Sequence, residues 1–235
     1  MLIDKNKIKW VWVDLDDTLW DFELNSLKSL EKVYAHFGLD RWFNSPAEFI
    51  DSYHATNHAL WADYNVGKIS RDYLMRERFL RPLMAVNYPL EDDTWQRFSD
   101  YYLDRLAECQ GTVPGAHELL HRLRAKGFRI GVLSNGFKEV QYRKMASAGL
   151  TDLIDCVVLS DEIGVNKPDR RLYDHAVAKA GTTAAESLII GDNPDTDILG
   201  GINAGWEVIY FNRNGAGKPL EGTPTVTSLD MIEPV

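Results

Sequence analysis

The stretch that decides the fold is IKWVWVDLDDTLW, residues 8–20. Its first six residues, Ile8 to Val13, are apolar except for Lys9, which predicts a short buried strand of a parallel sheet. Three carboxylates, those of Asp14, Asp16 and Asp17, follow at the carboxyl end of this strand, where open parallel sheets place their reactive groups. Crowded acids are costly unless a cation or a proton offsets them, so this strand end predicts a chemically active site.

The composition is that of a globular protein, with 45% hydrophobic and 26% charged residues among 235. The formal net charge of −9 argues against binding of a nucleic-acid polymer, but a local cation still allows a phosphorylated small molecule. Two cysteines are too few for a disulfide scaffold. We see neither a secretory signal nor an apolar run of about 18 residues, so we expect a cytoplasmic protein without a membrane span.

From Phe128 onward, short apolar runs alternate with amphipathic stretches. This alternation predicts βαβ units and a parallel sheet. With residues 8–13 as the first strand, the predicted fold class is α/β, a three-layer Rossmann-like core. The further predicted strands are 128–135, 156–160, 187–192 and 206–212, and the predicted helices between them are 136–148, 169–180 and 195–204.

The segment 24–111 lacks short valine and isoleucine runs and shows helical periodicity. Pro46 and Ser70 stand where helices would begin. We therefore predict an inserted α-helical cap over 23–111, with 1–22 and 112–235 forming the catalytic core. The predicted helices of the cap are 26–37, 46–64, 70–85 and 91–109.

Polar groups also end three other predicted strands. Ser134 and Asn135 form either an ordinary turn or an anion site made of a hydroxyl and a backbone N–H. Lys167, before a proline and a helix, is either a solvated charge or a group that reaches over the sheet to a phosphate. Asp192 adds another carboxylate at a strand end, and Asp197 follows it one helical turn into the next element.

The order Asp-x-Asp-x-Thr, Ser-Asn, Lys-Pro, Gly-Asp-x-x-x-x-Asp resembles the haloacid dehalogenase-like hydrolase superfamily. The resemblance covers nearly the whole chain, including a helical insert like the cap of the superfamily's first class. The dehalogenases that name the group lack an aspartate at the position of Asp16 and need no metal. Because Asp16, Lys167 and Asp192 occur together here, the chain resembles the phosphatases of the superfamily.

This resemblance implies hydrolysis of a phosphomonoester through an aspartyl-phosphate intermediate. Asp14 would attack phosphorus as the nucleophile. Asp16 would protonate the leaving alkoxide and then deprotonate the attacking water. Ser134 and Lys167 would hold the transferring oxygens, where the charge of the transition state is largest.

The same resemblance implies Mg²⁺ as the cofactor, since this ion prefers hard oxygen ligands. The expected ligands are Asp14, the backbone carbonyl of Asp16, and Asp192. Asp197 is expected to support Asp192 and Lys167 without binding the metal.

The stretch LWADYNVGKISRDYLMRERF, residues 60–79, looks like the cap of the noncanonical pyrimidine 5′-nucleotidases, through GKIS and the later RF. We therefore expect nucleoside 5′-monophosphates as substrates, pyrimidines above all. Sugar phosphates or other small phosphomonoesters are the alternative, and a phosphomutase also stays open. A non-catalytic regulatory module would be expected to have lost acidic or basic residues of the four motifs, and all are present. The residues assigned to substrate binding are Thr18, Asn135, Trp20 and Phe22, the two aromatic rings because they can stack on a planar leaving group.

Overall fold

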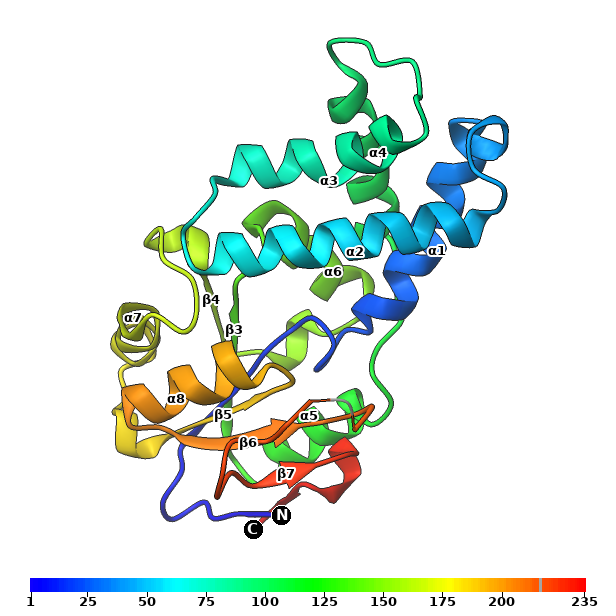
Figure 1. Ribbon diagram of the computed structural model, residues 1–235. Coiled ribbons are helices and arrows are strands. Elements are labelled where there is room, and N and C mark those ends of the chain that lie inside the picture. Colours follow the sequence, from blue (N-terminus) through cyan, green and yellow to red (C-terminus); the bar gives the residue numbers. More distant parts are fainter. Residues whose placement is uncertain (216) are drawn as a thin grey trace. The chain divides into compact units, whose positions relative to one another are not determined.

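The computed structural model describes residues 1–215 and 217–235, which divide into two compact units (Figure 1). Met1–Phe22 and Gln110–Val235 together form a unit built around a sheet, which we call the sheet unit. Glu23–Cys109 form the second, helical unit. The predicted α/β class, with a parallel sheet and a helical insert, is confirmed.

The main sheet has six parallel strands in the order β4-β3-β2-β5-β6-β7. Five of them match the predicted strands. A sixth strand and a separate two-stranded parallel sheet, β1 with β8, lie outside the predictions, because two-residue strands are too short to show a period. The strands are β1 Leu2–Ile3, β2 Trp10–Val13, β3 Arg129–Ser134, β4 Cys156–Leu159, β5 Ser187–Gly191, β6 Glu207–Phe211, β7 Thr225–Val226 and β8 Glu233–Pro234.

Strand β2 lies between β3 and β5, and Val13 is level with Val132 of β3 and Ile190 of β5. The chain proceeds from β2 to β3 and β4 on one side, then returns to β5 and β6 on the other. A topological switch point therefore lies at the carboxyl end of β2, which is where open α/β sheets bind their ligands. Asp14 is the first residue beyond that end.

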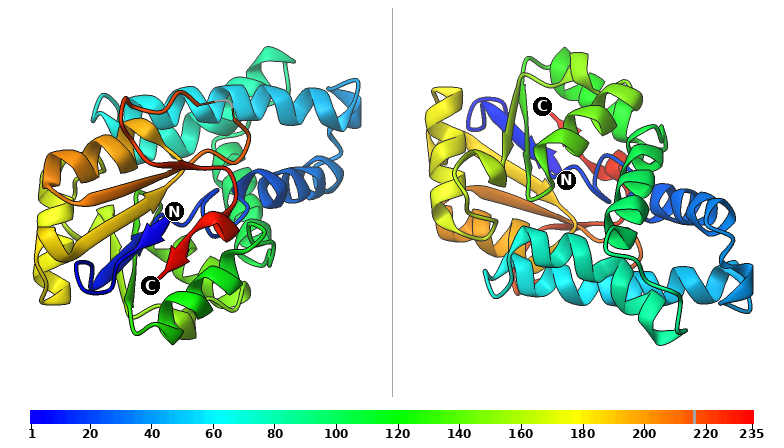
Figure 2. Two further views of the ribbon diagram at one scale, coloured as in Figure 1. Left: turned by 90° about the horizontal axis from the view of Figure 1, so that it is seen from below. Right: turned by 90° about the horizontal axis from the view of Figure 1, so that it is seen from above.

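Helices cover both faces of the sheet. Figure 2 shows α7, Arg170–Ala180, and α8, Leu199–Ala204, on one side, with α5, Ala116–Ala125, and α6, Lys138–Ser147, on the other. Under α7 and α8 lies an apolar core that includes three tryptophans in sequence-distant positions. The fully or nearly fully buried residues of this core are Trp10, Trp12, Leu133, Val158, Leu172, Tyr173, Ala176, Ile189, Ile198, Ala204, Trp206, Val208 and Tyr210.

The helical unit contains the four predicted helices, with ends set by local capping. Ser45 precedes α2, and its hydroxyl accepts from the N–H of Glu48; Ser70 caps α3 through the N–H of Tyr73 in the same way. The first helix begins at Phe22, earlier than predicted. The helices are α1 Phe22–His36, α2 Pro46–Asn65, α3 Arg71–Ala85 and α4 Thr94–Ala107. Throughout the described residues, every helix falls short of the length and apolar character needed to cross a membrane.

Close packing of Gly131 on Trp12 yields a first prediction. A Cβ at Gly131 would overlap the indole ring of Trp12, which also stacks on Trp10 with ring centroids 5.3 Å apart. We expect Gly131→Ala to lower the free energy of unfolding by about 1–3 kcal/mol, the usual cost of overpacking a core. Urea denaturation measures this loss.

The matched control shrinks the ring instead. In the double variant Gly131→Ala with Trp12→Leu, the added methyl group has room, so the two losses should not add. Simple additivity of the two losses would contradict the packing explanation.

Candidate active site

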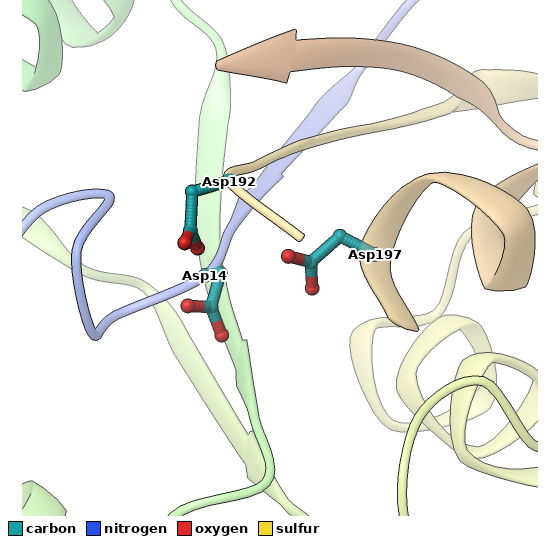
Figure 3. A group of neighbouring side chains, drawn as sticks. All are labelled: Asp14, Asp192 and Asp197. Carbon is teal, nitrogen blue, oxygen red and sulfur yellow. The ribbon is translucent and has the colours of Figure 1, made fainter. Parts of the chain in front are cut away.

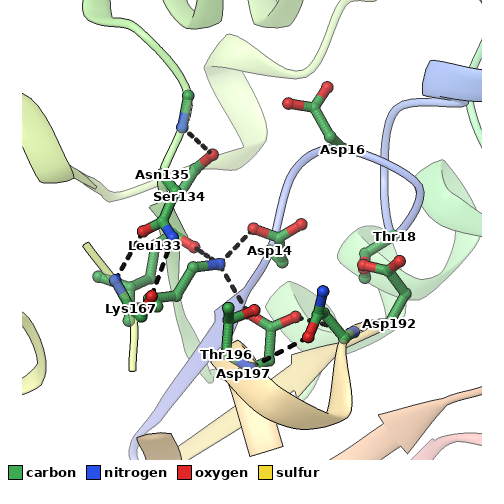
Figure 4. A network of polar contacts seen from close by, with 12 residues as sticks. Asp14, Asp16, Thr18, Leu133, Ser134, Asn135, Lys167, Asp192, Thr196 and Asp197 are labelled. Carbon is green, nitrogen blue, oxygen red and sulfur yellow. Dashed lines mark hydrogen bonds and ion pairs between the residues drawn. The ribbon is translucent and has the colours of Figure 1, made fainter. Parts of the chain in front are cut away.

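Asp14 stands at the centre of a polar network beyond the end of β2 (Figure 4). Its backbone N–H donates to the carbonyl of Ile190 at 2.9 Å, which continues the pairing of β2 with β5 by one residue. The side chain is buried, and its Oδ1 accepts from Nζ of Lys167 at 2.5 Å. Among the described residues, Oδ2 of Asp14 accepts no hydrogen bond, so one oxygen is held and the other is left to react.

Lys167 is a fully engaged buried cation. Its Nζ donates to Asp14, to Oδ1 of Asp197 at 2.6 Å and to the carbonyl of Leu133 at 2.8 Å, which uses all three protons. Its backbone is fixed by Asn135, whose Oδ1 accepts from the Lys167 N–H at 2.7 Å and whose Nδ2 donates to the Lys167 carbonyl at 3.1 Å. The Lys167-Pro168 peptide bond is cis. Asn135 thus holds Lys167 in place, and its part in substrate binding stays a prediction.

Three carboxylates converge beside this lysine. Asp14, Asp192 and Asp197 each offer an oxygen within 4.8 Å of the others (Figure 3). Asp192 follows β5, and its Oδ1 accepts from the buried hydroxyl of Thr18 at 3.2 Å. Within the described residues, the cluster therefore sets three acids against one ammonium group.

The crowding raises the pKa values of the acids. Burial raises the pKa of Asp14 to about 7, although the charge of Lys167 acts in the opposite direction. Burial also raises the pKa of Asp192 well above its usual range, and the charges of Asp14 and Asp197 add to this effect. Burial alone would lower the pKa of Lys167, but the charges of Asp14 and Asp197 outweigh it and the pKa is raised. The lysine is thus held charged, and the three acids still carry more negative charge than this one cation offsets.

Asp197 is fixed more tightly than the other two acids. Its Oδ1 accepts from Lys167, and its Oδ2 accepts from the N–H of Asn193 at 3.1 Å. A Cβ at Gly191 would overlap this carboxylate, so the glycine before Asp192 gives Asp197 its place. With both oxygens engaged, Asp197 is arranged to orient Lys167.

Ser134 ends β3 beside the same network. Its buried hydroxyl accepts from the N–H of Gly136 at 3.1 Å and from Nε2 of Gln141 at 2.8 Å. Both contacts use the oxygen as acceptor, so the hydroxyl proton is left for another acceptor. This is the arrangement expected of a donor to a substrate oxygen.

Asp16 lies apart from the acid cluster. Its carboxylate accepts from Gln141 and from Lys144, two residues of α6 that the sequence reasoning did not single out. Asp17 has a φ of 58°, and its N–H donates to the carbonyl of Trp20 at 2.7 Å. Asp17 therefore shapes the turn after Asp16.

Trp20 and Phe22 lie near each other, with ring centroids 6.4 Å apart. Trp20 is fully buried and Phe22 is half-buried. The ammonium group of Lys144 lies over both rings. Stacking of either ring on a leaving group stays a prediction.

The donor set fits a hard divalent cation. Carboxylate oxygens of Asp14 and Asp192 lie within 4.8 Å of each other, and Mg²⁺ prefers such oxygen ligands together with water and phosphate. A charge of +2 would also offset the excess negative charge of the cluster. The geometry thus sets the positive charge of Lys167 next to acids whose oxygens suit a cation.

Known proteins similar to this chain belong to one family of hydrolases. The family model for haloacid dehalogenase-like hydrolases matches residues 8–205. Pyrimidine 5′-nucleotidase YjjG of Escherichia coli K12 is 33% identical over 231 residues, which cover 96% of this chain and 97% of that protein. Pyrimidine 5′-nucleotidase PynA of Streptococcus pneumoniae is 30% identical and covers 92% of this chain, with 89% of its own length.

Among solved structures, that of the HAD-hydrolase YfnB from Bacillus subtilis, bound to magnesium, is similar with a TM-score of 0.84. It is 25% identical, and the match covers 96% of each chain. The resemblance seen in the motifs is thereby confirmed, over the sheet and the helical insert alike. The chain belongs to the haloacid dehalogenase-like hydrolase family.

Proposed function

We propose that this protein is a Mg²⁺-dependent phosphatase that hydrolyses nucleoside 5′-monophosphates, pyrimidine nucleotides above all, through an aspartyl-phosphate intermediate. The observation that carries the proposal is the pairing of Asp14 with Lys167 in a cluster whose three acids outnumber this one cation. The proposed nucleophile, its neighbouring cation and the proposed metal ligands thus lie together at the carboxyl edge of the sheet. Two relatives at 30% identity or more are named pyrimidine 5′-nucleotidases, which supports the choice of substrate.

Asp14 is suited to act as the nucleophile. Lys167 fixes one of its oxygens, and the other accepts no hydrogen bond within the described part of the chain. Attack by this oxygen on phosphorus forms the aspartyl-phosphate and expels the alkoxide of the substrate. The positive charge of Lys167, held beside Asp14, and the remaining proton of the Ser134 hydroxyl stabilise the phosphoryl oxygens while charge develops on them.

Asp16 is the acid and base of the proposal. It lies two residues beyond the proposed nucleophile, and its carboxylate accepts from Gln141 and Lys144 of α6. In the first step Asp16 gives a proton to the leaving alkoxide, and in the second it takes a proton from water.

A Mg²⁺ ion would be held by the carboxylates of Asp14 and Asp192 and by the backbone carbonyl of Asp16. When bound, it would polarise the phosphoryl group and offset the repulsion among the acids. Thr18 fixes the orientation of Asp192 through its hydroxyl, and Asp197 does the same for Lys167.

The helical unit, residues 23–109, is proposed to select the leaving group, as caps do in this superfamily. Its stretch 60–79 carries the GKIS and RF features that the sequence shares with pyrimidine 5′-nucleotidases. Small phosphorylated metabolites other than nucleotides are the alternative that a substrate panel has to test.

Replacement of the nucleophile gives the first functional prediction. Asp14→Asn keeps the shape of the side chain but removes the attacking carboxylate, so phosphatase activity should fall by roughly 10⁴-fold or more. Release of inorganic phosphate from a nucleotide substrate measures this loss, and thermal unfolding shows that the fold is retained.

Asp17→Asn is the matched control, since it makes the same chemical change three residues further along. Asparagine accepts the positive φ of this position, so the turn is preserved. The control should keep its activity. An Asp14→Asn enzyme with unchanged turnover would contradict the assigned nucleophile.

Metal dependence is the second functional prediction. EDTA should suppress activity, and Mg²⁺, but not Zn²⁺ alone, should restore it. Mg²⁺ should also raise the Tm of the metal-free protein, because it binds the folded acid cluster. Asp192→Asn should lose this Tm increase, and an undiminished increase in that variant would contradict the assigned ligand set.

Substrate preference is the third. A panel of pyrimidine and purine nucleoside 5′-monophosphates and sugar phosphates is compared by kcat/KM. We expect pyrimidine nucleotides to exceed sugar phosphates by at least about tenfold, a difference that a few pocket contacts supply. A sugar phosphate as the best substrate would overturn the nucleotide assignment, and conversion to an isomer without phosphate release would indicate a mutase.

A further inference from the structure

Two side chains of α6 hold the carboxylate of Asp16, one on each oxygen. Nζ of Lys144 lies 2.7 Å from Oδ1, and Nε2 of Gln141 donates to Oδ2 at 2.9 Å. Figure 4 shows Asp16 apart from the dashed contacts that join Asp14, Lys167 and Asp197. The two aspartates of the first motif thus have separate cations.

The spacing of the two residues on α6 explains how both can contact the carboxylate of Asp16. Gln141 and Lys144 are three residues apart, which puts their side chains on one face of the helix. Gln141 also donates to the hydroxyl of Ser134, so one amide joins Ser134 to Asp16. A Cβ at Gly136 would overlap this amide, so a glycine at that position admits it.

Lys144 is buried, with an exposed fraction of 4%. Its ammonium group lies 4.5 Å from the ring centroid of Trp20 and 5.4 Å from that of Phe22. Aromatic faces favour a cation, and a buried ammonium group needs an anion as partner. Its surroundings therefore hold the ammonium group of Lys144 against Asp16.

We propose that Lys144 and Gln141 are positioning residues that hold Asp16 as a hydrogen-bond acceptor for the second half of the reaction, the hydrolysis of the aspartyl-phosphate. This inference rests on the proposed function and deepens it. In that step the oxygen of water attacks phosphorus and the bond between phosphorus and Asp14 breaks. Its electron pair returns to the carboxylate of Asp14, and a proton of the water passes to Asp16.

The geometry favours this half of the reaction because both contacts are donated to Asp16. A carboxylate oxygen that accepts one hydrogen bond keeps a further lone pair, so each oxygen of Asp16 is held in place and can still accept from a water molecule. Because both oxygens of Asp16 are already oriented, little conformational entropy is lost when the carboxylate accepts a proton from water.

A substrate with a good leaving group separates the two halves. The p-nitrophenolate ion leaves without being protonated, so the first step on p-nitrophenyl phosphate does not need an acid. Loss of Lys144 should then slow only the second step, and the aspartyl-phosphate should accumulate. In that case kcat and KM fall together, whereas kcat/KM, which reports the first step, is retained.

The experiment uses the full chain with Mg²⁺ and p-nitrophenyl phosphate, in steady state and by stopped flow. For Lys144→Met we expect kcat to fall at least about tenfold and kcat/KM to stay within about threefold of the parent, a partial loss of general base catalysis. A burst should appear that approaches one p-nitrophenolate per enzyme. Lys144→Arg, which keeps the positive charge, should restore part of kcat.

Lys138→Met is the matched control, because it makes the same replacement at an exposed lysine at the start of α6. It should leave kcat, kcat/KM and the burst unchanged. Lys144→Gln, a polar replacement without charge, serves if thermal unfolding shows that Lys144→Met is not folded.

Two results would overturn the inference while the proposed function stands: an unchanged kcat in folded Lys144 variants, or an equal fall in kcat and kcat/KM without a burst. The second result would indicate a structural role for Lys144. A parent enzyme that releases phosphate from no substrate would instead remove the proposed function, and this inference with it.

Discussion

The ion pair between Lys167 and Asp14 is the interaction on which the site depends. Its lysine is buried, and removing one partner of a buried pair typically costs about 3–5 kcal/mol because a charge is left uncompensated. Asp197 and the carbonyl of Leu133 take the remaining protons, so the ammonium group is held at one point in space. The sheet makes this possible, since Leu133 lies in β3, beside the strand that presents Asp14.

Close approaches around this pair require residues without side chains. Gly191 leaves room for the carboxylate of Asp197, and Gly136 leaves room for the amide of Gln141. Gly131 does the same for the ring of Trp12 inside the sheet. The polar network around Asp14 and the apolar core therefore depend on the same feature, a glycine at a point of close contact.

The alternation of apolar runs with amphipathic stretches predicted the parallel sheet, and helical periodicity without short valine and isoleucine runs predicted the helical insert, because periodicity reports which face is buried. The strand ends likewise located Asp14, Ser134 and Asp192, since the carboxyl ends of parallel strands share one edge. Gln141 and Lys144 were not predicted as part of the site, because lysine and glutamine on an amphipathic helix usually face solvent. Their burial depends on packing between segments that are distant in the sequence, and a local sequence pattern does not report such packing.

The two aspartates of the first motif follow the same strand but lie in different surroundings. Asp14 lies beside Asp192 and Asp197 with Lys167 as the cation, and burial raises the pKa of Asp14 to about 7. A divalent cation would restore its ionised form. Asp16 lies outside this acid cluster and accepts from the ammonium group of Lys144 and the amide of Gln141. Pairs of acids in unlike surroundings are how enzymes divide nucleophile from acid and base. In the proposed function, α6 would make that division. This helix is the next one after the strand that ends in Ser134, so a single strand-turn-helix segment presents both the hydroxyl proposed to hold phosphate and the partners of Asp16.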